Sequence, residues 1–386
     1  MFSATNPAAP LLAVSVPLGV QYGANAPGAI TVQDSTLRVD EAQSLILAGG
    51  EVVLENASLA VALLEDGQVV GVGEGGRIDI GAVAGAGTLE LTETNNLLGL
   101  RFPENLARAD VRLTDTTTLD VEANNGGDLA VTARNIDILG ESELLAGIER
   151  NLGLLGSQAG DIRLDATRAI RLDQDSRLAN RIRSNAIGNG GDIEITTGTL
   201  RVSNGSQISA STFGAGDGGR LSISAGVVEV IGSDGDGNAS AISAQVNPGA
   251  TGDAQDLTID AGRLVASDGG QIRVSTFGAG NAGQLRVQAD GIELIGDDPD
   301  DGDPSGLFAN VNRNATGRGG DIRILAAGRL SVQDGAALSA STFGAGMEGD
   351  SPFQQGWSKS SAAIGRATLA QFVLGSIQGQ GAMPKT

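Results

Sequence analysis

The hexapeptide Ser-Thr-Phe-Gly-Ala-Gly occurs three times in this chain at nearly constant spacing. The copies span Ser211–Gly216, Ser275–Gly280 and Ser341–Gly346, so their starts lie 64 and 66 residues apart. A fixed period of this length is typical of repeat architectures, in which each unit packs mainly against its neighbours along the chain. The sequence therefore predicts an array of stacked units rather than an ordinary globular domain.

A shorter repeat lies inside this period. A small or aspartate-bearing turn is followed by alternating apolar and polar residues, and successive copies start 28 to 37 residues apart. The alternation has period 2, which is typical of β-strands. The copies are GGDLAV from Gly126, AGDIRL from Ala159, GGDIEI from Gly190, GGRLSI from Gly218, AQDLTI from Ala254, AGQLRV from Ala282 and GGDIRI from Gly319.

Each short repeat contains three strand-like segments, as in residues 193–195, 200–202 and 208–210. Three strands and three corners describe one coil of a triangular solenoid, whose equivalent strands stack about 4.8 Å apart. A propeller or a sandwich is the rival fold, but both need hairpins, whereas these segments recur at a fixed offset in one direction. We therefore predict an all-β fold, a right-handed parallel β-helix of about ten to twelve coils and roughly 50 Å length.

The strand pattern divides the chain into three parts. Residues 121–346 contain the regular repeats. Residues 1–120 show the same alternation less regularly, and residues 347–386 form a divergent tail in which Ser360–Ile377 is compatible with a short helix, with disorder as the alternative. The strand segments expected in the first part are Gly28–Val32, Glu51–Leu54, Arg77–Ile80 and Thr88–Leu91.

The composition excludes several classes of function. The net charge is −21 and the chain has no cysteine and no histidine. An acidic protein is a poor partner for nucleic acid, because phosphate binding needs a basic face. Disulfides, zinc sites and histidine-based catalysis are excluded because their residues are missing. No signal peptide is recognised, since the first basic residue, Arg38, follows the apolar stretch Leu11–Val20.

The repeats resemble a known family. The run TGTLRVSNGSQISASTFGAGDGGRLSI from Thr197, with its copies, is similar to large repetitive exoproteins of the filamentous haemagglutinin-like family. FSATNP from Phe2, LAGGEVVLENASL from Leu47, GGRIDIGAVAGAGTLEL from Gly75 and GSQAGDIRLDATRAIRL from Gly156 also resemble this group. The similarity covers about residues 2–346.

The resemblance carries expectations about function. It implies a secreted or cell-surface structural protein of the adhesion type, exported by two-partner secretion through an outer-membrane transporter. Its partners would be a surface polysaccharide or the surface of a host or neighbouring cell. The family's signal peptide and the first half of its secretion domain, with its Asn-Pro-Asn-Gly motif, have no counterpart here. The chain is therefore expected to be an N-terminally truncated member, and a gene fragment without function is one alternative.

An enzyme is the other alternative. A column of aspartates, expected at one corner of successive coils, would suit a β-helical polysaccharide hydrolase or lyase, because glycoside hydrolysis uses paired carboxylates. Arg220 and Gln284 interrupt the column, and capping of the turn backbone explains aspartate there without catalysis. We therefore assign no catalytic residue and expect no enzyme. The column is Asp128, Asp161, Asp192, Asp256 and Asp321.

Calcium is the only cofactor for which the chain offers candidates, and no other cofactor is expected. Two acidic loops, Ser233–Asn238 and Asp297–Asp303, lie in insertions between the second and third strands of their coils, Ser233–Ala241 and Asp297–Gly306. Asp234, Asp236 and Asn238 alternate as in a calcium loop, but the closing glutamate is missing. Solvated acidic loops are the competing interpretation.

Glycine and phenylalanine recur at another corner. GAGDGG from Gly214 matches a dinucleotide-binding fingerprint, but a strand follows it where that fingerprint needs a helix. Glycines that permit tight corners are the favoured interpretation. Phe213, Phe277 and Phe343 recur every second coil. They are expected to pack into the corner, and an exposed aromatic row for polysaccharide is the alternative.

Overall fold

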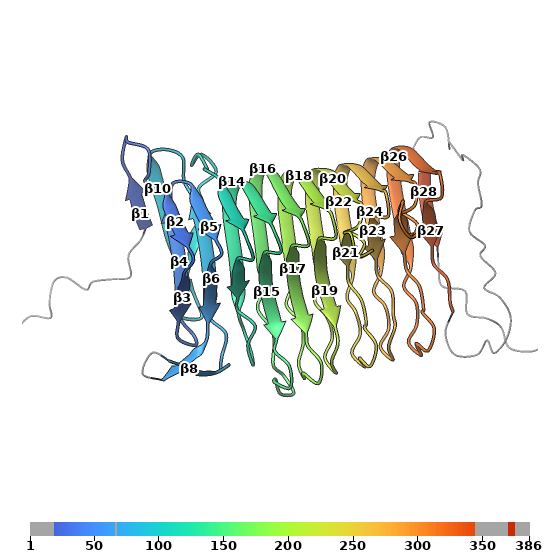
Figure 1. Cartoon of the computed structure of the whole chain (residues 1–386), viewed down its shortest axis with the longest axis horizontal. Coiled ribbons are helices and arrows are strands. Elements are labelled where there is room, and N and C mark those ends of the chain that lie inside the picture. The colour runs from blue at the N-terminus through green and yellow to red at the C-terminus, as the bar shows by residue number, and fades with distance from the viewer. Residues whose placement is uncertain (1–18, 66–67, 344–369, 375–386) are drawn as a thin grey trace, which may run out of the picture.

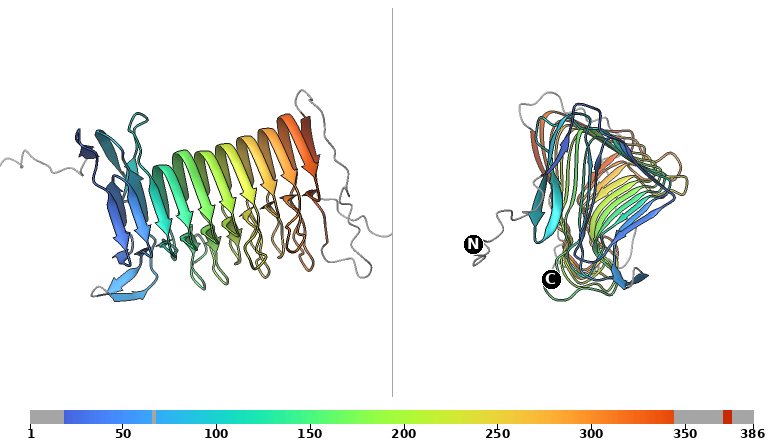
Figure 2. Two further views of the ribbon diagram at one scale, coloured as in Figure 1. Left: turned by 45° about the horizontal axis from the view of Figure 1, so that its top comes forward. Right: turned by 90° about the vertical axis from the view of Figure 1, so that its left-hand side faces the viewer.

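The computed structural model describes residues 19–65, 68–343 and 370–374. In this part of the chain, most strands cross a long rod and stack along its axis in sequence order from one end to the other (Figure 1). Viewed along the axis, the coils superpose as a triangle (Figure 2). The described residues form strands and turns but no helix, so none of them forms a helix that could cross a membrane.

Two large sheets form the walls of the rod, and every pair of neighbouring strands in them is parallel except the pair at the C-terminal end. The ten-stranded sheet contains β3 (Thr36–Val39), β6 (Ser58–Val61), β13 (Thr118–Asp120), β15 (Glu143–Ile148), β17 (Arg177–Ile182), β19 (Gln207–Thr212), β21 (Ala241–Ser243), β23 (Gln271–Arg273), β25 (Gly306–Phe308) and β27 (Ala337–Ser339). The thirteen-stranded sheet contains β2 (Ile30–Gln33), β4 (Ser44–Gly49), β5 (Val52–Glu55), β9 (Arg77–Ala82), β12 (Val111–Thr114), β14 (Asp128–Leu139), β16 (Ile162–Asp173), β18 (Ile193–Ser203), β20 (Leu221–Ile231), β22 (Leu257–Ser267), β24 (Leu285–Ile295), β26 (Ile322–Gln333) and β28 (Ala370–Leu374). The predicted parallel β-helix is confirmed.

The three predicted segments of a coil are present, but the first two are continuous. Residues 193–195 and 200–202 both lie in β18, and residues 208–210 lie in β19. The strand β18 pairs with β20 along its length, from Ile193↔Leu221 to Ser203↔Ile231. The corner between the first two segments is therefore a bend within one strand.

Aliphatic side chains fill the axis of the rod. In β18 the pattern of burial alternates, with Ile193, Ile195, Leu200 and Val202 fully buried and Glu194 exposed. Because strands pair in register, the same core position recurs on the next coil, as for Ile195 and Ile223. Most of the buried aliphatic residues of the rod belong to one continuous core that extends from Val52 to Leu330. Each coil therefore covers the apolar side chains of the next, as in other solenoids.

The N-terminal part departs from the predicted regularity. Arg77–Ile80 lies in the parallel strand β9, as expected, but Thr88–Leu91 lies in β10 (Gly87–Thr94). This strand pairs antiparallel with β11 (Leu97–Arg101) and with β1 (Gly19–Tyr22). Thr88–Leu91 is therefore a strand, as expected, but it belongs to antiparallel pairs and not to the parallel sheets of the helix. A second hairpin, β7 (Leu63–Glu65) with β8 (Gln68–Gly71), leaves the coil after β6.

A buried carboxylate ties the first hairpin to the rod. Asp79 in β9 is 1% exposed, and its Oδ2 accepts hydrogen bonds from the backbone N–H of Leu100 and from the Arg77 guanidinium. Burial raises the pKa of Asp79 despite these contacts. The side chain thus joins the edge of the hairpin to the coil beneath it.

At the C-terminal end, β28 pairs antiparallel with β26. The short helix expected over Ser360–Ile377 is therefore wrong for residues 370–374, and the rest of that segment lies outside the described residues. The physical reason is that the last coil presents the unpaired N–H and C=O groups of an edge strand, which an added strand satisfies.

Candidate functional site

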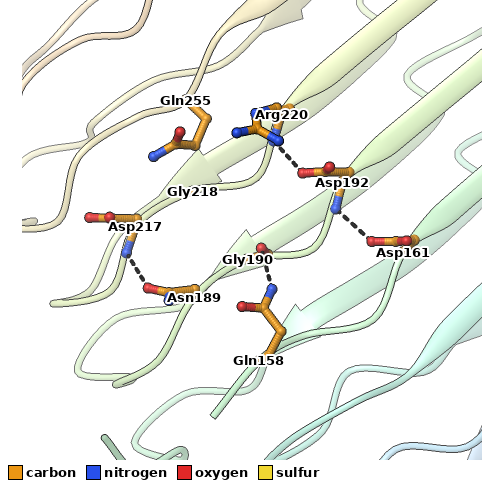
Figure 3. A pocket seen from close by; sticks show the side chains of 9 residues that line it. All are labelled: Gln158, Asp161, Asn189, Gly190, Asp192, Asp217, Gly218, Arg220 and Gln255. Atoms are coloured by element: carbon orange, nitrogen blue, oxygen red, sulfur yellow. Dashed lines mark hydrogen bonds between the residues drawn. The ribbon is translucent and has the colours of Figure 1, made fainter. Parts of the chain in front are cut away.

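The predicted aspartate column exists, and it connects coils. The backbone N–H of Asp161 donates to Asp128 Oδ1, and that of Asp192 donates to Asp161 Oδ1, both at 2.9 Å. The N–H of Arg220, which interrupts the column, donates to Asp192 Oδ1 at 2.8 Å (Figure 3). Each carboxylate thus caps the backbone of the following coil, which confirms capping as the structural role of these aspartates.

A second column of Asp and Asn side chains runs beside the first and repeats the same contact. Asp217 Oδ1 accepts the N–H of Asp253, and Asp253 Oδ1 accepts the N–H of Asn281. The two columns line a surface depression together with Gln158 and Gln255 (Figure 3). In most of these carboxylates, one oxygen accepts a backbone N–H of the next coil. These hydrogen bonds between coils explain why acidic side chains line the depression.

The calcium candidates form a hydrogen-bonded loop. Asp234 Oδ1 accepts the N–H groups of Asp236 and Asn238, and its Oδ2 accepts the Asn238 side-chain amide. Although burial opposes the effect, these hydrogen bonds lower the pKa of Asp234. Asn238 turns its nitrogen, not its oxygen, toward Asp234. The described residues contain no group of three or more histidine, cysteine, aspartate or glutamate side chains placed to hold a metal ion, and calcium binding by Asp234, Asp236 and Asn238 stays a prediction.

The phenylalanine column is only partly covered. Phe213 and Phe277 are half-buried, whereas Phe343 on the last described coil is 37% exposed. The backbone N–H of Phe213 donates to Ile182 O on the preceding coil, and that of Phe277 donates to Val246 O. The burial of the first two favours packing in the corner over a freely exposed aromatic row.

The outward face of the ten-stranded sheet carries a charged cluster that the sequence analysis missed. Glu122 follows β13, and its carboxylate accepts two hydrogen bonds from Arg183 Nε and Nη2 at 2.7 and 2.5 Å. Glu149 Oε2 lies 3.6 Å from the same Nε. Asp120 and Arg181 are also close, because each contributes to the electrostatic environment of Glu122. Glu122 and Arg183 occupy outward positions two coils apart, and their opposite charges are the sequence signal that was missed.

Burial raises the pKa of Glu122 to about 7, although hydrogen bonds from Arg183 lower it. The ordinary pKa of glutamate is 4.5, so between these values the folded state holds a proton that the unfolded state has lost. The free energy of unfolding should therefore fall as pH rises from about 5 to 8, by at most about 3 kcal/mol from this group. We expect a steeper fall for the wild type than for Glu122→Gln in urea unfolding measured across this range. If the free energy of unfolding depends equally on pH in the wild type and in Glu122→Gln, the raised pKa of Glu122 is contradicted.

The C-terminal half of the same face differs in character. Core residues alternate with outward residues, so Arg273, beside the buried Ile272, points outward between Ser243 and Phe308 of the adjacent strands. Its Nε is buried and has no hydrogen-bond partner in the described part of the chain, as is also true of Arg181 Nε and Gln245 Nε2. Burial lowers the pKa of Arg273, and Asp303 is the main opposing charge. These donors were not singled out from the sequence either.

Comparison of the chain with models of protein families, with curated proteins and with solved structures finds no match.

Proposed function

We propose that this chain is a structural exoprotein of the adhesion type, a β-helical rod that presents one of its faces to a surface ligand. The observation that carries the proposal is the outward face of the ten-stranded sheet, where hydrogen-bond donors of Arg181, Gln245 and Arg273 are buried without partners. A rod repeats such positions along its length, which suits an extended ligand.

Two further arguments support this function. The repeats resemble exoproteins that reach the cell surface through a two-partner secretion transporter, which would be the partner in export. The net charge of −21 keeps a repetitive rod with exposed sheet edges from associating with itself. In this proposal the turn aspartates and acidic loops maintain the fold, and no residue is assigned to catalysis.

The proposal is tested by adhesion and by export. Beads coated with the purified chain should adhere to polysaccharide-coated or cell-coated surfaces more than beads coated with albumin. The chain, placed behind the leader and secretion domain of a two-partner substrate and co-expressed with its transporter, should become sensitive to protease added outside intact cells. If the coated beads adhere to none of the surfaces tested, the adhesion role is rejected.

One observation favours an enzyme as the second candidate. Glu122, whose pKa is raised to about 7, lies near Asp120 and shares Arg183 with Glu149, and a carboxyl group of this kind resembles the general acid of a glycosidase. Arg183, however, binds both oxygens of Glu122, whose side chain is 1% exposed. Release of reducing sugar from acidic glycans, abolished by Glu122→Gln, would favour the enzyme over the adhesion protein.

A further inference from the structure

The loop between β24 and β25 contains both Asp–Pro bonds of the chain, Asp298–Pro299 and Asp303–Pro304. The amide nitrogen of proline is tertiary and carries no hydrogen, and it is easier to protonate and to expel than the nitrogen of other peptide bonds. An aspartate before it supplies a carboxylate that can attack the main-chain carbonyl carbon of its own residue. Asp–Pro is therefore the peptide bond that breaks most readily in mild acid, and the loop treats its two copies differently.

The carboxylate of Asp298 is already occupied. The residue is 3% exposed, and its Oδ1 accepts the N–H of Asp300 at 2.8 Å. The hydroxyl of Ser233 and the N–H of Asp301 also donate to this carboxylate, and these hydrogen bonds lower the pKa of Asp298 although burial opposes them. Attack on its own carbonyl carbon would require Asp298 to give up these donors.

The carboxylate of Asp303 is in the opposite situation. The residue is exposed, and its N–H donates to Asp301 Oδ1 at 2.8 Å. Among the hydrogen bonds of the described residues, none occupies the carboxylate of Asp303 itself. Arg273 in β23 attracts it electrostatically. The side chain is therefore free to turn toward its own carbonyl carbon, and solvent can deliver protons and water to the bond.

The bond that follows Asp303 is held on both sides. The carbonyl oxygen of Asp303 accepts the N–H of Asp298 at 2.7 Å. This oxygen gains negative charge when a nucleophile attacks, and a backbone N–H directed at it stabilises that charge, as in an oxyanion hole. Pro304 forms a β-bridge with Asp297, and its carbonyl oxygen accepts Gln271 Nε2 at 3.2 Å. The loop thus fixes the bond and leaves the nucleophile mobile.

We propose that Asp303–Pro304 is a self-cleavage site of the folded chain. In mild acid, a carboxylate oxygen of Asp303 attacks the main-chain carbonyl carbon of the same residue, and the nitrogen of Pro304 takes a proton from hydronium. The C–N bond breaks with its electron pair on nitrogen, which leaves a five-membered cyclic anhydride at Asp303 and a secondary amine at Pro304. Water then opens the anhydride to two carboxyl groups. The net reaction consumes one water, and it is independent of the proposed adhesion function.

The cleaved rod should stay assembled. β25 begins two residues after Pro304 and pairs with both β23 and β27. Its Leu307 is fully buried in the continuous core. The fragments 1–303 and 304–386 are therefore expected to elute together in gel filtration and to separate only in denaturant. Separate elution without denaturant would contradict this part of the inference.

The test compares the two bonds in the folded and the unfolded chain. The full chain is incubated at the lowest pH at which its circular dichroism is unchanged, and in concentrated urea at the same pH, and fragments are quantified by mass spectrometry. The folded chain should break at Asp303–Pro304 at least about tenfold faster than at Asp298–Pro299, because attack by Asp298 breaks hydrogen bonds to a charged group. In urea the two rates should be similar.

Two results of this comparison would overturn the inference. Equal rates at the two bonds in the folded chain would show that the loop does not select between them. Slower cleavage of Asp303–Pro304 in the folded chain than in urea would show that the fold protects this bond instead of exposing it to attack.

Substitutions test the chemistry. Asp303→Ala removes the nucleophile and Pro304→Ala removes the tertiary amide, so each should slow cleavage after residue 303 at least about tenfold. Pro299→Ala is the matched control, because it makes the same change at the other Asp–Pro bond. It should alter that rate by less than about twofold, as for most surface substitutions. Unchanged cleavage in Asp303→Ala, or equal losses in Pro304→Ala and Pro299→Ala, would rule out self-cleavage by Asp303.

Discussion

Replacing Ile259 by Asp is expected to lower the free energy of unfolding by roughly 4 kcal/mol or more. Ile259 in β22 is fully buried, and its neighbours in register on the adjacent coils are Ile223 and Val287. The side chain therefore has apolar residues above and below it in the axial core. A carboxylate placed there has neither water nor a cation to stabilise its charge.

The effect should extend beyond one coil. Ile223 and Val287 belong to the same continuous core as Ile259, and in a solenoid each repeat is stabilised mainly by its neighbours. Loss of the β22 coil therefore removes one face of packing from both flanking coils. Urea unfolding followed by circular dichroism should show a lower midpoint, or two transitions in place of one as the two halves of the rod uncouple.

Thr258→Asp is the matched control, because it introduces the same charge one residue away. Thr258 points outward, and its register partner on the next coil is Arg286. We expect a change of less than about 0.5 kcal/mol, as for most surface substitutions. If the two variants lose stability equally, the alternation of core and surface positions in β22 is refuted, and with it the stacked core.

The regular part of this fold could be predicted because the alternation within one strand recurs, at a fixed offset in the sequence, in the strand that pairs with it. Apolar residues at i and i+2 place Ile193 and Ile195 in the core, and the same pattern recurs at a fixed offset at Leu221 and Ile223. The strand Thr88–Leu91 shows the same alternation, but its partners are β1 and β11 in antiparallel pairs. Alternation identifies a strand and one buried face, whereas the direction of its neighbour is not encoded locally.

The candidate site was harder to predict because its contacts lie across coils. Turn aspartates such as Asp161 were expected to cap the turn backbone, but the sequence did not indicate that this carboxylate receives the N–H of Asp192, 31 residues ahead on the next coil. Glu122 and Arg183 are 61 residues apart in sequence. Loops of unequal length intervene, so only the strand register brings these two side chains together. Outward positions carry no apolar pattern that would reveal a pair such as Glu122 and Arg183.

The repeated hexapeptide now has a physical explanation. Thr212 Oγ1 donates to the carbonyl of Gly216 at 2.6 Å and accepts the N–H of Gly214 at 3.3 Å. Thr276 makes the same two contacts in the next copy, with Gly280 and Gly278. The threonine hydroxyl therefore fixes the corner from within. Tight corners were predicted for these glycines, but the contact of each corner with its neighbouring coil was not.

Gly216→Ala is expected to destabilise the rod by roughly 3 kcal/mol. A Cβ at Gly216 would lie 1.3 Å from the carbonyl oxygen of Gly188 on the preceding coil, and one at Gly252 would lie 2.0 Å from that of Gly216. The same close approach recurs at Gly280 and Gly317. Both partners are backbone atoms, so the corner must move by more than an ångström and strain the adjoining hydrogen bonds. Overpacking of this kind typically costs about 1–3 kcal/mol, and more where backbone must shift.

Gly291→Ala is the matched control, and we expect it to change stability in the opposite direction. Gly291 in β24 has no atom within 4 Å of an added Cβ, and its φ lies outside the left-handed region. Alanine should therefore stabilise the rod by about 0.4–1 kcal/mol, because it restricts the unfolded chain without strain. Urea midpoints that move in opposite directions for the two variants would establish that close contact between coils, not flexibility, requires glycine at the corner. Equal shifts would show that the loss of glycine itself is what matters, and the close-packed corner would have to be abandoned.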